Sequence, residues 1–327
     1  MTELQTPPTE LPVQPSKKQT PRWVGYCLIG SVGLLIGAVL LWGISTLSGV
    51  DWSGKKLRVV QLQSAFTQEI DPDAAEGDGD IVTVQDSDLG TLQLQKNHRL
   101  GINPLAGISP PEEGDRFAPT VDGYTVLQGI DVSEWQGVID WEAVAEDGID
   151  FAIIRCGYRG YAEDGNICED SHFAENLAGA KEAGLAVGVY FYSQAVGRDE
   201  AIEEARFVLE SLDGAELDLP IFFDWELSGT DTRTDNLPSA NLNVAATHFL
   251  QTVTDAGYQG GLYAYKYLAY LEYDLAQFAA YPFWLAEYGT TDFYYGYTFL
   301  QYTDAGRVDG IYGDVDRNLL IVKDAEE

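Results

Sequence analysis

The alternation of short apolar runs with amphipathic stretches, from Leu127 onward, is the feature that most restricts the fold of this chain. This order is typical of parallel β-strands joined by crossover helices. Helical periodicity is clear at 172–183, 199–212 and 240–256, whereas the later connections are short and aromatic. We therefore expect an α/β, TIM-like barrel of eight strands with incomplete helices, of (β/α)5β3 type, with strands near 127–132, 151–155, 186–192, 220–226, 261–265, 283–287, 298–302 and 313–316.

The fourth apolar run ends in two carboxylates, Asp224 and Glu226, separated by Trp225. Residues i and i+2 of a strand point to the same face, so the two carboxylates should project together. Trp225 and Phe223 should then point to the other face. Two solvated acids are the alternative reading of an isolated Asp-x-Glu, so the other strand ends must decide between solvation and chemistry.

Other expected strands also end in acids, namely Asp131, Glu287 and Asp314 or Asp316. In eight-stranded βα barrels the carboxyl ends of the strands carry the catalytic groups. If the barrel closes, these acids converge on one pocket. Like charges in a pocket of low dielectric raise the pKa of at least one member, as a general acid at neutral pH requires.

Several motifs follow one another in order along the barrel region. They are Gly-Ile-Asp-Val-Ser-Glu-Trp-Gln-Gly at 129–137, Phe-Ala-Ile-Ile-Arg-Cys-Gly-Tyr at 151–158, Asp170-x-x-Phe173-x-x-Asn176, Gly-Val-Tyr-Phe-Tyr-Ser at 188–193, Asp224-x-Glu226, Trp284-x-Ala-x-Tyr288, Gln301-Tyr302 and Val315-Asp316-x-Asn318. Together they resemble glycoside hydrolase family 25 over residues 127–322. The resemblance implies a lysozyme-type N-acetylmuramidase that cuts the β-1,4 bond between N-acetylmuramic acid and N-acetylglucosamine in peptidoglycan, without a cofactor or a metal.

The resemblance also implies roles for four acids. Glu226 matches the general acid, and Asp224 matches the carboxylate that assists the 2-acetamido group of the substrate. Asp131 and Asp316 match the two remaining acids of the pocket, which position the substrate and tune the pKa of the pair. Aromatic residues near strand ends are expected to contact the glycan strands of peptidoglycan: Tyr158, Tyr192, Tyr263, Trp284, Tyr288 and Tyr302.

The N-terminal region predicts a membrane anchor. Residues 23–50 form an almost uncharged run that is long enough to span a bilayer, and basic residues precede it in the polar segment 1–22. Lys55, Lys56 and Arg58 follow the run, so charge alone does not decide the orientation. Because the expected substrate lies outside the membrane, we expect 1–22 to be a cytoplasmic tail, 23–50 a single-pass signal anchor, and the catalytic domain to lie outside the cell membrane. Secretion after signal cleavage is the alternative.

Residues 51–123 show no clear helical period, and the acidic, Gly-rich part before Asp88 is typical of a solvated linker. Two alternating runs, 81–84 and 91–95, could pair as a small β-hairpin or pack on the next domain. The prolines before Gly123 favour extended chain. We therefore expect a linker or small β region up to 123 and the catalytic barrel over 124–327.

Composition excludes some partners. The chain has 52 acidic and 19 basic residues, a net charge of −33, which argues against binding of nucleic acid. With three His and three Cys, a zinc or redox-metal site is not expected. Cys156 and Cys168 are close enough in sequence to form a disulfide in an extracytoplasmic domain, and two free thiols are the alternative. The sequence implies no oligomeric state.

Two other functions remain open at this level. The barrel could be a non-catalytic module that binds the cell wall while the membrane helix anchors it. It could also be an unrelated barrel hydrolase that holds magnesium with carboxylates alone. The four acids at the expected positions favour catalysis without a metal.

Overall fold

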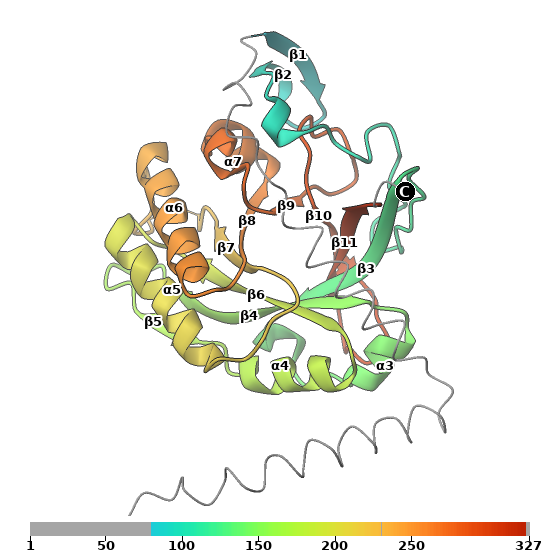
Figure 1. The fold of residues 1–327 in the computed structure, drawn as a ribbon, viewed down its shortest axis with the longest axis vertical. Coiled ribbons are helices and arrows are strands. Elements are labelled where there is room, and N and C mark those ends of the chain that lie inside the picture. The colour runs from blue at the N-terminus through green and yellow to red at the C-terminus, as the bar shows by residue number, and fades with distance from the viewer. Residues whose placement is uncertain (1–79, 230, 325–327) are drawn as a thin grey trace, which may run out of the picture. The chain divides into compact units, whose positions relative to one another are not determined.

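The structure, a computed structural model, describes residues 80–229 and 231–324. In this part of the chain, eight strands form a closed barrel in which β3 pairs with both β11 and β4 (Figure 1). The predicted eight-stranded barrel is confirmed. Its strands are β3 (Tyr124–Val132), β4 (Phe151–Arg159), β6 (Ala186–Ser193), β7 (Ile221–Trp225), β8 (Gly260–Tyr265), β9 (Phe283–Ala286), β10 (Phe299–Gly306) and β11 (Val315–Lys323).

The last strand differs from its expected range. We expected a strand over 313–316, but β11 begins at Val315 and continues through the apolar run to Lys323. It is antiparallel to both of its neighbours, whereas the other barrel pairs are parallel. The beginning of β11 therefore lies beside the carboxyl ends of the other strands, and Asp316 is the cross-strand partner of Asp131.

Helices follow the first five barrel strands, in agreement with a (β/α)5β3 barrel. They are α3 (Trp141–Glu146), α4 (Phe173–Glu182), α5 (Arg198–Leu212), α6 (Ser239–Asp255) and α7 (Lys266–Leu271). The sequence predicted α4, α5 and α6 but not α3 and α7, which have only six residues each. Short elements complete the described part: β5 (Ile167–Glu169), η2 (His98–Leu100), η3 (Glu134–Gln136) and η4 (Leu275–Phe278).

Alternation along β7 separates two hydrophobic cores. Phe222 points into the barrel, where its ring lies 5.0 Å from that of Trp284 and 5.2 Å from that of Phe299. Phe223 points outward and packs on Phe249 of α6 at 5.1 Å. Trp225 lies on the same outer side, and its indole N–H donates to the carbonyl of Ala195 at 3.2 Å. The predicted orientation of the strand is confirmed, and Asp224 faces the barrel end.

The hairpin expected before the barrel is present as β1 (Ile81–Asp86) and β2 (Gly90–Gln95), paired antiparallel. It packs on the connection between β9 and β10 and is not a free linker. The Ser87 N–H donates to Asp292 at 2.8 Å, and the Tyr295 hydroxyl donates to the Gln95 carbonyl at 2.8 Å. Residues 1–22, 23–50 and 51–79, to which the tail, anchor and linker predictions apply, lie outside the described residues.

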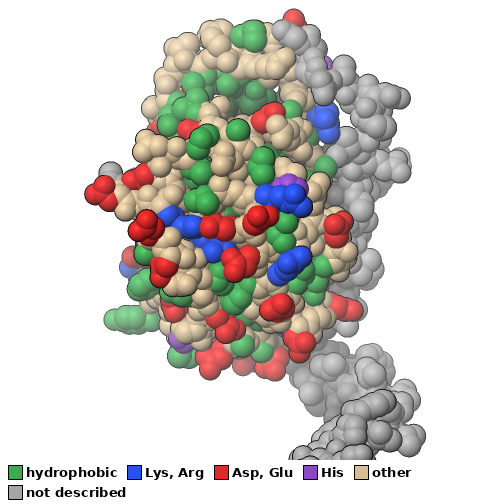
Figure 2. All heavy atoms as spheres, turned by 90° about the vertical axis from the view of Figure 1, so that its left-hand side faces the viewer, with side chains coloured by type: hydrophobic (Ala, Val, Ile, Leu, Met, Phe, Trp, Pro, Cys, Tyr) green, Lys and Arg blue, Asp and Glu red, His purple; other side chains and the backbone are tan. Residues whose placement is uncertain are grey.

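Within the described residues, no helix combines the length and apolar character needed to cross a bilayer. Figure 2 shows acidic side chains spread over the face that carries α5 and α6, as expected from the net charge of −33.

Of the two alternatives for Cys156 and Cys168, a disulfide or two free thiols, the structure has two free thiols. The two side chains have different partners. The buried thiol of Cys156 forms a hydrogen bond with Ser211 of α5, and burial raises the pKa of this thiol to about 12. Cys168 lies on β5 opposite Tyr158 and forms a hydrogen bond with it.

Candidate active site

Four acids lie at the same end of the barrel. Asp131 on β3 and Asp316 on β11 are cross-strand partners, and Asp224 is the penultimate residue of β7. Glu226 follows directly after the last residue of β7. Asp131 and Asp224 are each 5% exposed, so their carboxylates are held in a site with little water.

A network of neutral side chains holds Asp131. The side-chain amides of Gln301 and Asn318 each donate to Asp131 Oδ2 at 2.8 Å. Asn318 is oriented in turn by the indole N–H of Trp284, which donates to its Oδ1 at 2.8 Å. Gln301 Oε1 accepts from the hydroxyls of Tyr263 at 3.2 Å and Tyr288 at 2.8 Å. Both amides thus present N–H groups to the carboxylate.

Burial raises the pKa of two acids on the β3–β11 side. The pKa of Asp131 rises to about 6, because burial outweighs the hydrogen bonds from Asn318 and Gln301 that favour its ionised form. The pKa of Asp316 rises to about 9, through burial first and then through the negative charges of Asp131 and Asp304. Asp316 therefore carries a proton at neutral pH.

The pair on β7 shows the same trend. Burial, followed by the charges of Glu226 and Asp131, raises the pKa of Asp224 well above its ordinary value. Burial also raises the pKa of Glu226, against a hydrogen bond from Tyr263 that lowers it. Among the described residues, nothing donates to the buried Asp224 Oδ1. Burial and mutual repulsion thus disfavour ionisation of both carboxyl groups at once.

The aromatic residues expected to bind substrate fall into two groups. Tyr158 and Tyr192 are half-buried near the ends of β4 and β6, and Tyr288 is 44% exposed beyond β9. These three present ring surface at the acid end of the barrel. Tyr263, Trp284 and Tyr302 are instead buried at 6%, 1% and 4% exposure.

The buried aromatics have structural partners. Tyr263 contacts Gln301 and Glu226, and Trp284 orients Asn318. The hydroxyl of Tyr302 accepts from the Phe117 N–H at 3.2 Å. None of the three offers an exposed ring to a sugar.

Two other charged residues lie close to the four acids or at the neighbouring strand end. Arg155 on β4 forms ion pairs with Asp170 at 2.7 Å and Glu134 at 3.2 Å, and its charge acts to lower the pKa of Asp224. Glu287, considered among the converging acids, accepts from the Asp292 and Phe293 N–H groups and faces Lys266 at 3.4 Å. Glu287 thus belongs to a cluster beneath the β1–β2 hairpin.

Gln301 and Asn318 are the residues that reasoning from the sequence did not assign to the site. Both occur in the recognised motifs, Gln301-Tyr302 and Val315-Asp316-x-Asn318, and that was the available signal. Neutral amides give no pattern of charge, so only the cross-strand pairing of Gln301 with Asn318 shows that both face Asp131. Within the described residues, no cluster of three or more His, Cys, Asp or Glu side chains is arranged to hold a metal ion.

Comparisons with known proteins agree with this geometry. The "Uncharacterized protein YegX" of Escherichia coli (strain K12) is 31% identical over 218 residues, which are 62% of this chain and 72% of that protein. "Lysozyme M1" of Streptomyces globisporus is 30% identical over 212 residues, 59% of this chain and 67% of that protein. The crystal structure of the bacterial lysozyme from Streptomyces coelicolor matches with a TM-score of 0.51 at 27% identity, covering 59% of this chain and 90% of the other.

The family model described as "Glycosyl hydrolases family 25" matches residues 130–311, which include Asp131, Asp224 and Glu226. The match ends before β11, whose Asp316 completes the set of four acids by pairing with Asp131. The match extends over more than half of the chain, and the chain belongs to glycosyl hydrolases family 25.

Proposed function

We propose that this glycoside hydrolase is an N-acetylmuramidase that cleaves the β-1,4 bond between N-acetylmuramic acid and N-acetylglucosamine in peptidoglycan. Glu226 is the general acid and Asp224 assists the acetamido group of the substrate. Asp131 and Asp316 position the substrate and tune the pKa of the pair. The observation that carries this proposal is the convergence of four acids with raised pKa values at one barrel end.

The free Asp224 Oδ1 supports a division of roles within the pair. An acetamido N–H that donates to this oxygen stabilises ionised Asp224, because a hydrogen bond to the charged form lowers a pKa. The shared proton is then left to Glu226. Substrate binding thus prepares both groups: a carboxylate that orients the acetamido group and an acid that faces the glycosidic oxygen.

The reaction then proceeds in two steps. The acetamido carbonyl oxygen bonds the anomeric carbon as the glycosidic C–O bond breaks, and Glu226 gives its proton to the leaving oxygen. The amide N–H proton remains held by Asp224. Water, deprotonated by Glu226, then attacks the anomeric carbon and opens the five-membered ring that the acetamido oxygen formed with this carbon. This step regenerates the acetamido group and the acid.

This route predicts retention of configuration, since the anomeric carbon is inverted twice. The usual inference from the distance between two carboxylates does not apply when the substrate supplies the nucleophile. Proton NMR of the first-formed anomer tests the route. A β-anomer that appears first supports it, and an α-anomer that appears first contradicts it.

Rim aromatics support a polymeric sugar substrate. Tyr192 and Tyr288 are partly exposed near the acids, Tyr158 lies farther along the same rim with Arg155 over its ring, and aromatic faces stack on sugar rings. A chain with a net charge of −33 cannot rely on electrostatic attraction to an anionic wall. Affinity must then come from stacking and hydrogen bonds.

We further propose that residues 23–50 anchor the chain in the cell membrane as a single-pass helix, with 1–22 in the cytoplasm and the barrel outside. The uncharged run supports a membrane span, and the position of peptidoglycan outside the membrane supports this orientation. Release after signal cleavage is the alternative. Fractionation of cells separates the two, because an anchored chain sediments with membranes and a cleaved chain appears in the medium without its first 50 residues.

Turbidity clearing of purified cell walls tests the activity. We expect the purified chain to clear walls, Glu226→Gln to lose clearing, and a chelator to have no effect. Binding to walls without clearing would favour the non-catalytic wall-binding module. Loss of clearing on chelation would favour a metal-dependent barrel hydrolase.

A further inference from the structure

The general acid lies just beyond the strand that carries it. The last residues of β7 in register with neighbouring strands are Trp225, opposite Ser193, and Asp224, opposite Tyr263. Glu226 follows these pairs, so sheet hydrogen bonds do not fix its peptide. Its carbonyl oxygen instead accepts a hydrogen bond of 2.8 Å from the side-chain amide of Gln194.

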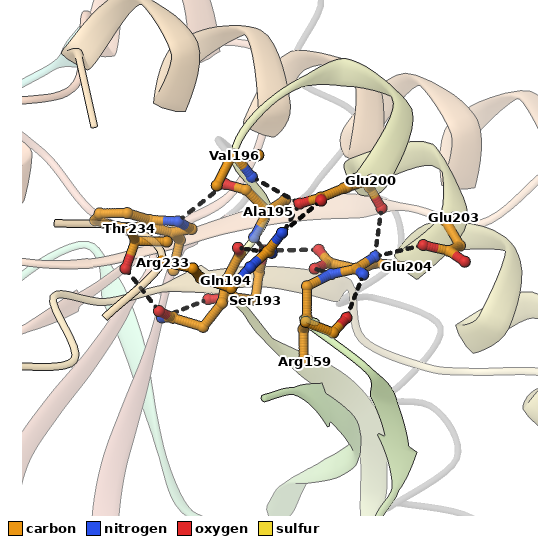
Figure 3. Close-up of polar contacts among 12 residues, drawn as sticks. Arg159, Ser193, Gln194, Ala195, Val196, Glu200, Glu203, Glu204, Arg233 and Thr234 are labelled. Carbon is orange, nitrogen blue, oxygen red and sulfur yellow. Dashed lines mark hydrogen bonds and ion pairs between the residues drawn. The ribbon is translucent and has the colours of Figure 1, made fainter. Parts of the chain in front are cut away.

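Gln194 is fully buried directly after β6, and all of its side-chain hydrogen-bonding capacity is used. Its Nε2 also donates to the Ser193 carbonyl at 2.9 Å. Its Oε1 accepts from the hydroxyls of Ser228 and of Thr234, the latter at 2.8 Å. Thr234 and its bond to Gln194 are visible in Figure 3.

These partners permit only one orientation of the amide. The carbonyl oxygens of Glu226 and Ser193 can only accept, so the group facing them must be the NH₂. The two hydroxyls then donate to the oxygen on the other side. A single side chain therefore connects the peptide of Glu226 to two later points of the same loop.

A second contact fixes the loop from outside. Arg233 makes two bonds to Glu200 of α5, at 2.6 and 2.8 Å, and a third of 2.7 Å to the backbone carbonyl of Gln194 (Figure 3). Burial alone would raise the pKa of Glu200, but the bonds from Arg233 and the Val196 N–H lower it overall. Glu200 is thus ionised at neutral pH, and bidentate pairs of this kind are geometrically specific.

From this geometry we propose that Gln194 is a positioning residue for Glu226: its amide sets the peptide after Glu226 and so aims the acid at the glycosidic oxygen. Ser228, Thr234 and the Arg233–Glu200 pair keep the amide and the loop in place. The catalytic part of this inference rests on the proposed function, whereas the loop's dependence on Gln194 does not.

Gln194→Met tests the proposal, because methionine has a similar length and cannot bond the Glu226 carbonyl. On a soluble peptidoglycan tetrasaccharide, we expect kcat to fall about 10- to 100-fold, since misplacing a catalytic group by about 1 Å has an effect of this size. KM should stay within about two-fold. Glu226 donates its proton only in the transition state, so its misplacement leaves ground-state binding unchanged. Thr234→Val and Ser228→Ala each remove one hydroxyl and should give smaller decreases of the same kind.

A substrate that does not need the acid separates positioning from a general loss of structure. In a dinitrophenyl β-glycoside of the N-acetylglucosaminyl-N-acetylmuramic acid disaccharide, the leaving group departs as a stable anion without protonation. We expect Gln194→Met to retain most of the wild-type kcat/KM for dinitrophenolate release from this glycoside. This parameter reports the first step, which here needs no protonation, and not the later attack of water that Glu226 assists. Glu203→Gln is the matched control, because Glu203 is an exposed residue of α5 that pairs with Arg159 at 2.8 Å. The rates of this variant should equal those of the wild type on both substrates.

Hydrogen exchange supplies a readout that does not require activity. The amides of residues 226–229 and 231–235 should exchange faster in Gln194→Met, or in Thr234→Val if the first variant does not fold. Unchanged exchange, or an equal loss of rate on both substrates, would overturn the proposal. Faster exchange in a chain whose wild type does not cleave peptidoglycan would instead refute the proposed function and retain Gln194 as the residue that holds the loop.

Discussion

Tyr263→Phe should raise the pH up to which the enzyme remains active. The Tyr263 hydroxyl shares its single proton between Gln301 Oε1, at 3.2 Å, and Glu226. Its hydrogen bond lowers the pKa of Glu226, and phenylalanine removes that donor without changing the ring. A hydrogen bond to a charged group contributes about 1.5–3 kcal/mol, and one pKa unit corresponds to about 1.4 kcal/mol. Without this bond, Glu226 keeps its proton to higher pH. The basic limb of the pH profile of kcat/KM should therefore move up by about one pH unit or more.

The assay is initial clearing of cell walls from pH 4 to 10. Tyr288→Phe is the matched control, because Tyr288 also donates to Gln301 Oε1, at 2.8 Å, but has no hydrogen bond to Glu226 among those that shift its pKa. It should leave the basic limb in place. A basic limb in Tyr263→Phe that is unchanged, or moves to lower pH, would refute the assignment of this limb to Glu226.

Two further predictions concern stability. Lys266→Met should destabilise the fold by about 3–5 kcal/mol in urea unfolding, because it leaves buried acids uncompensated; a loss below about 1 kcal/mol would contradict this. The buried lysine lies 2.6–3.4 Å from the carboxylates of Asp86, Asp88, Glu287 and Asp292. The melting temperature should fall as pH rises from about 5 to 9, because Asp131 and Asp316, whose pKa values are raised to about 6 and about 9, stabilise the fold only while protonated. Calorimetry that shows a rise instead would contradict the burial of these two groups.

Much of the fold could be predicted from the sequence, because the strands are marked by short apolar runs and by alternation of apolar and polar residues. Alternation in β7 correctly predicted that Phe223 and Trp225 face the helices while Asp224 faces the barrel end. The hairpin β1–β2 was predicted from period-two alternation, and packing on the next domain was considered. The contacts that attach it could not be predicted, since the ion pairs join residues 86–88 to residue 266, which is distant in sequence. Asp316 was correctly predicted to lie on the last strand, but it was expected at the end of that strand, whereas β11 begins one residue before it, at Val315.

Burial explains why the site could be predicted only in part. Trp284 and Tyr302 are aromatic, as sugar-binding residues often are, yet both are buried and form hydrogen bonds with neighbouring residues. Only tertiary structure distinguishes an exposed ring from a buried one. Gln194 is harder still to find, because its role depends on a hydrogen bond to a backbone carbonyl 32 residues away, which no side-chain pattern reveals.

The most direct test of the account is the identity and rate of formation of new reducing ends on purified peptidoglycan. Borohydride reduction and mass spectrometry should find reduced N-acetylmuramic acid, formed at least about 100-fold more slowly by folded Glu226→Gln, because general acid catalysis contributes about 10²–10⁴-fold. Reducing ends on N-acetylglucosamine, or an unchanged rate in Glu226→Gln, would contradict a muramidase that uses Glu226 as its acid.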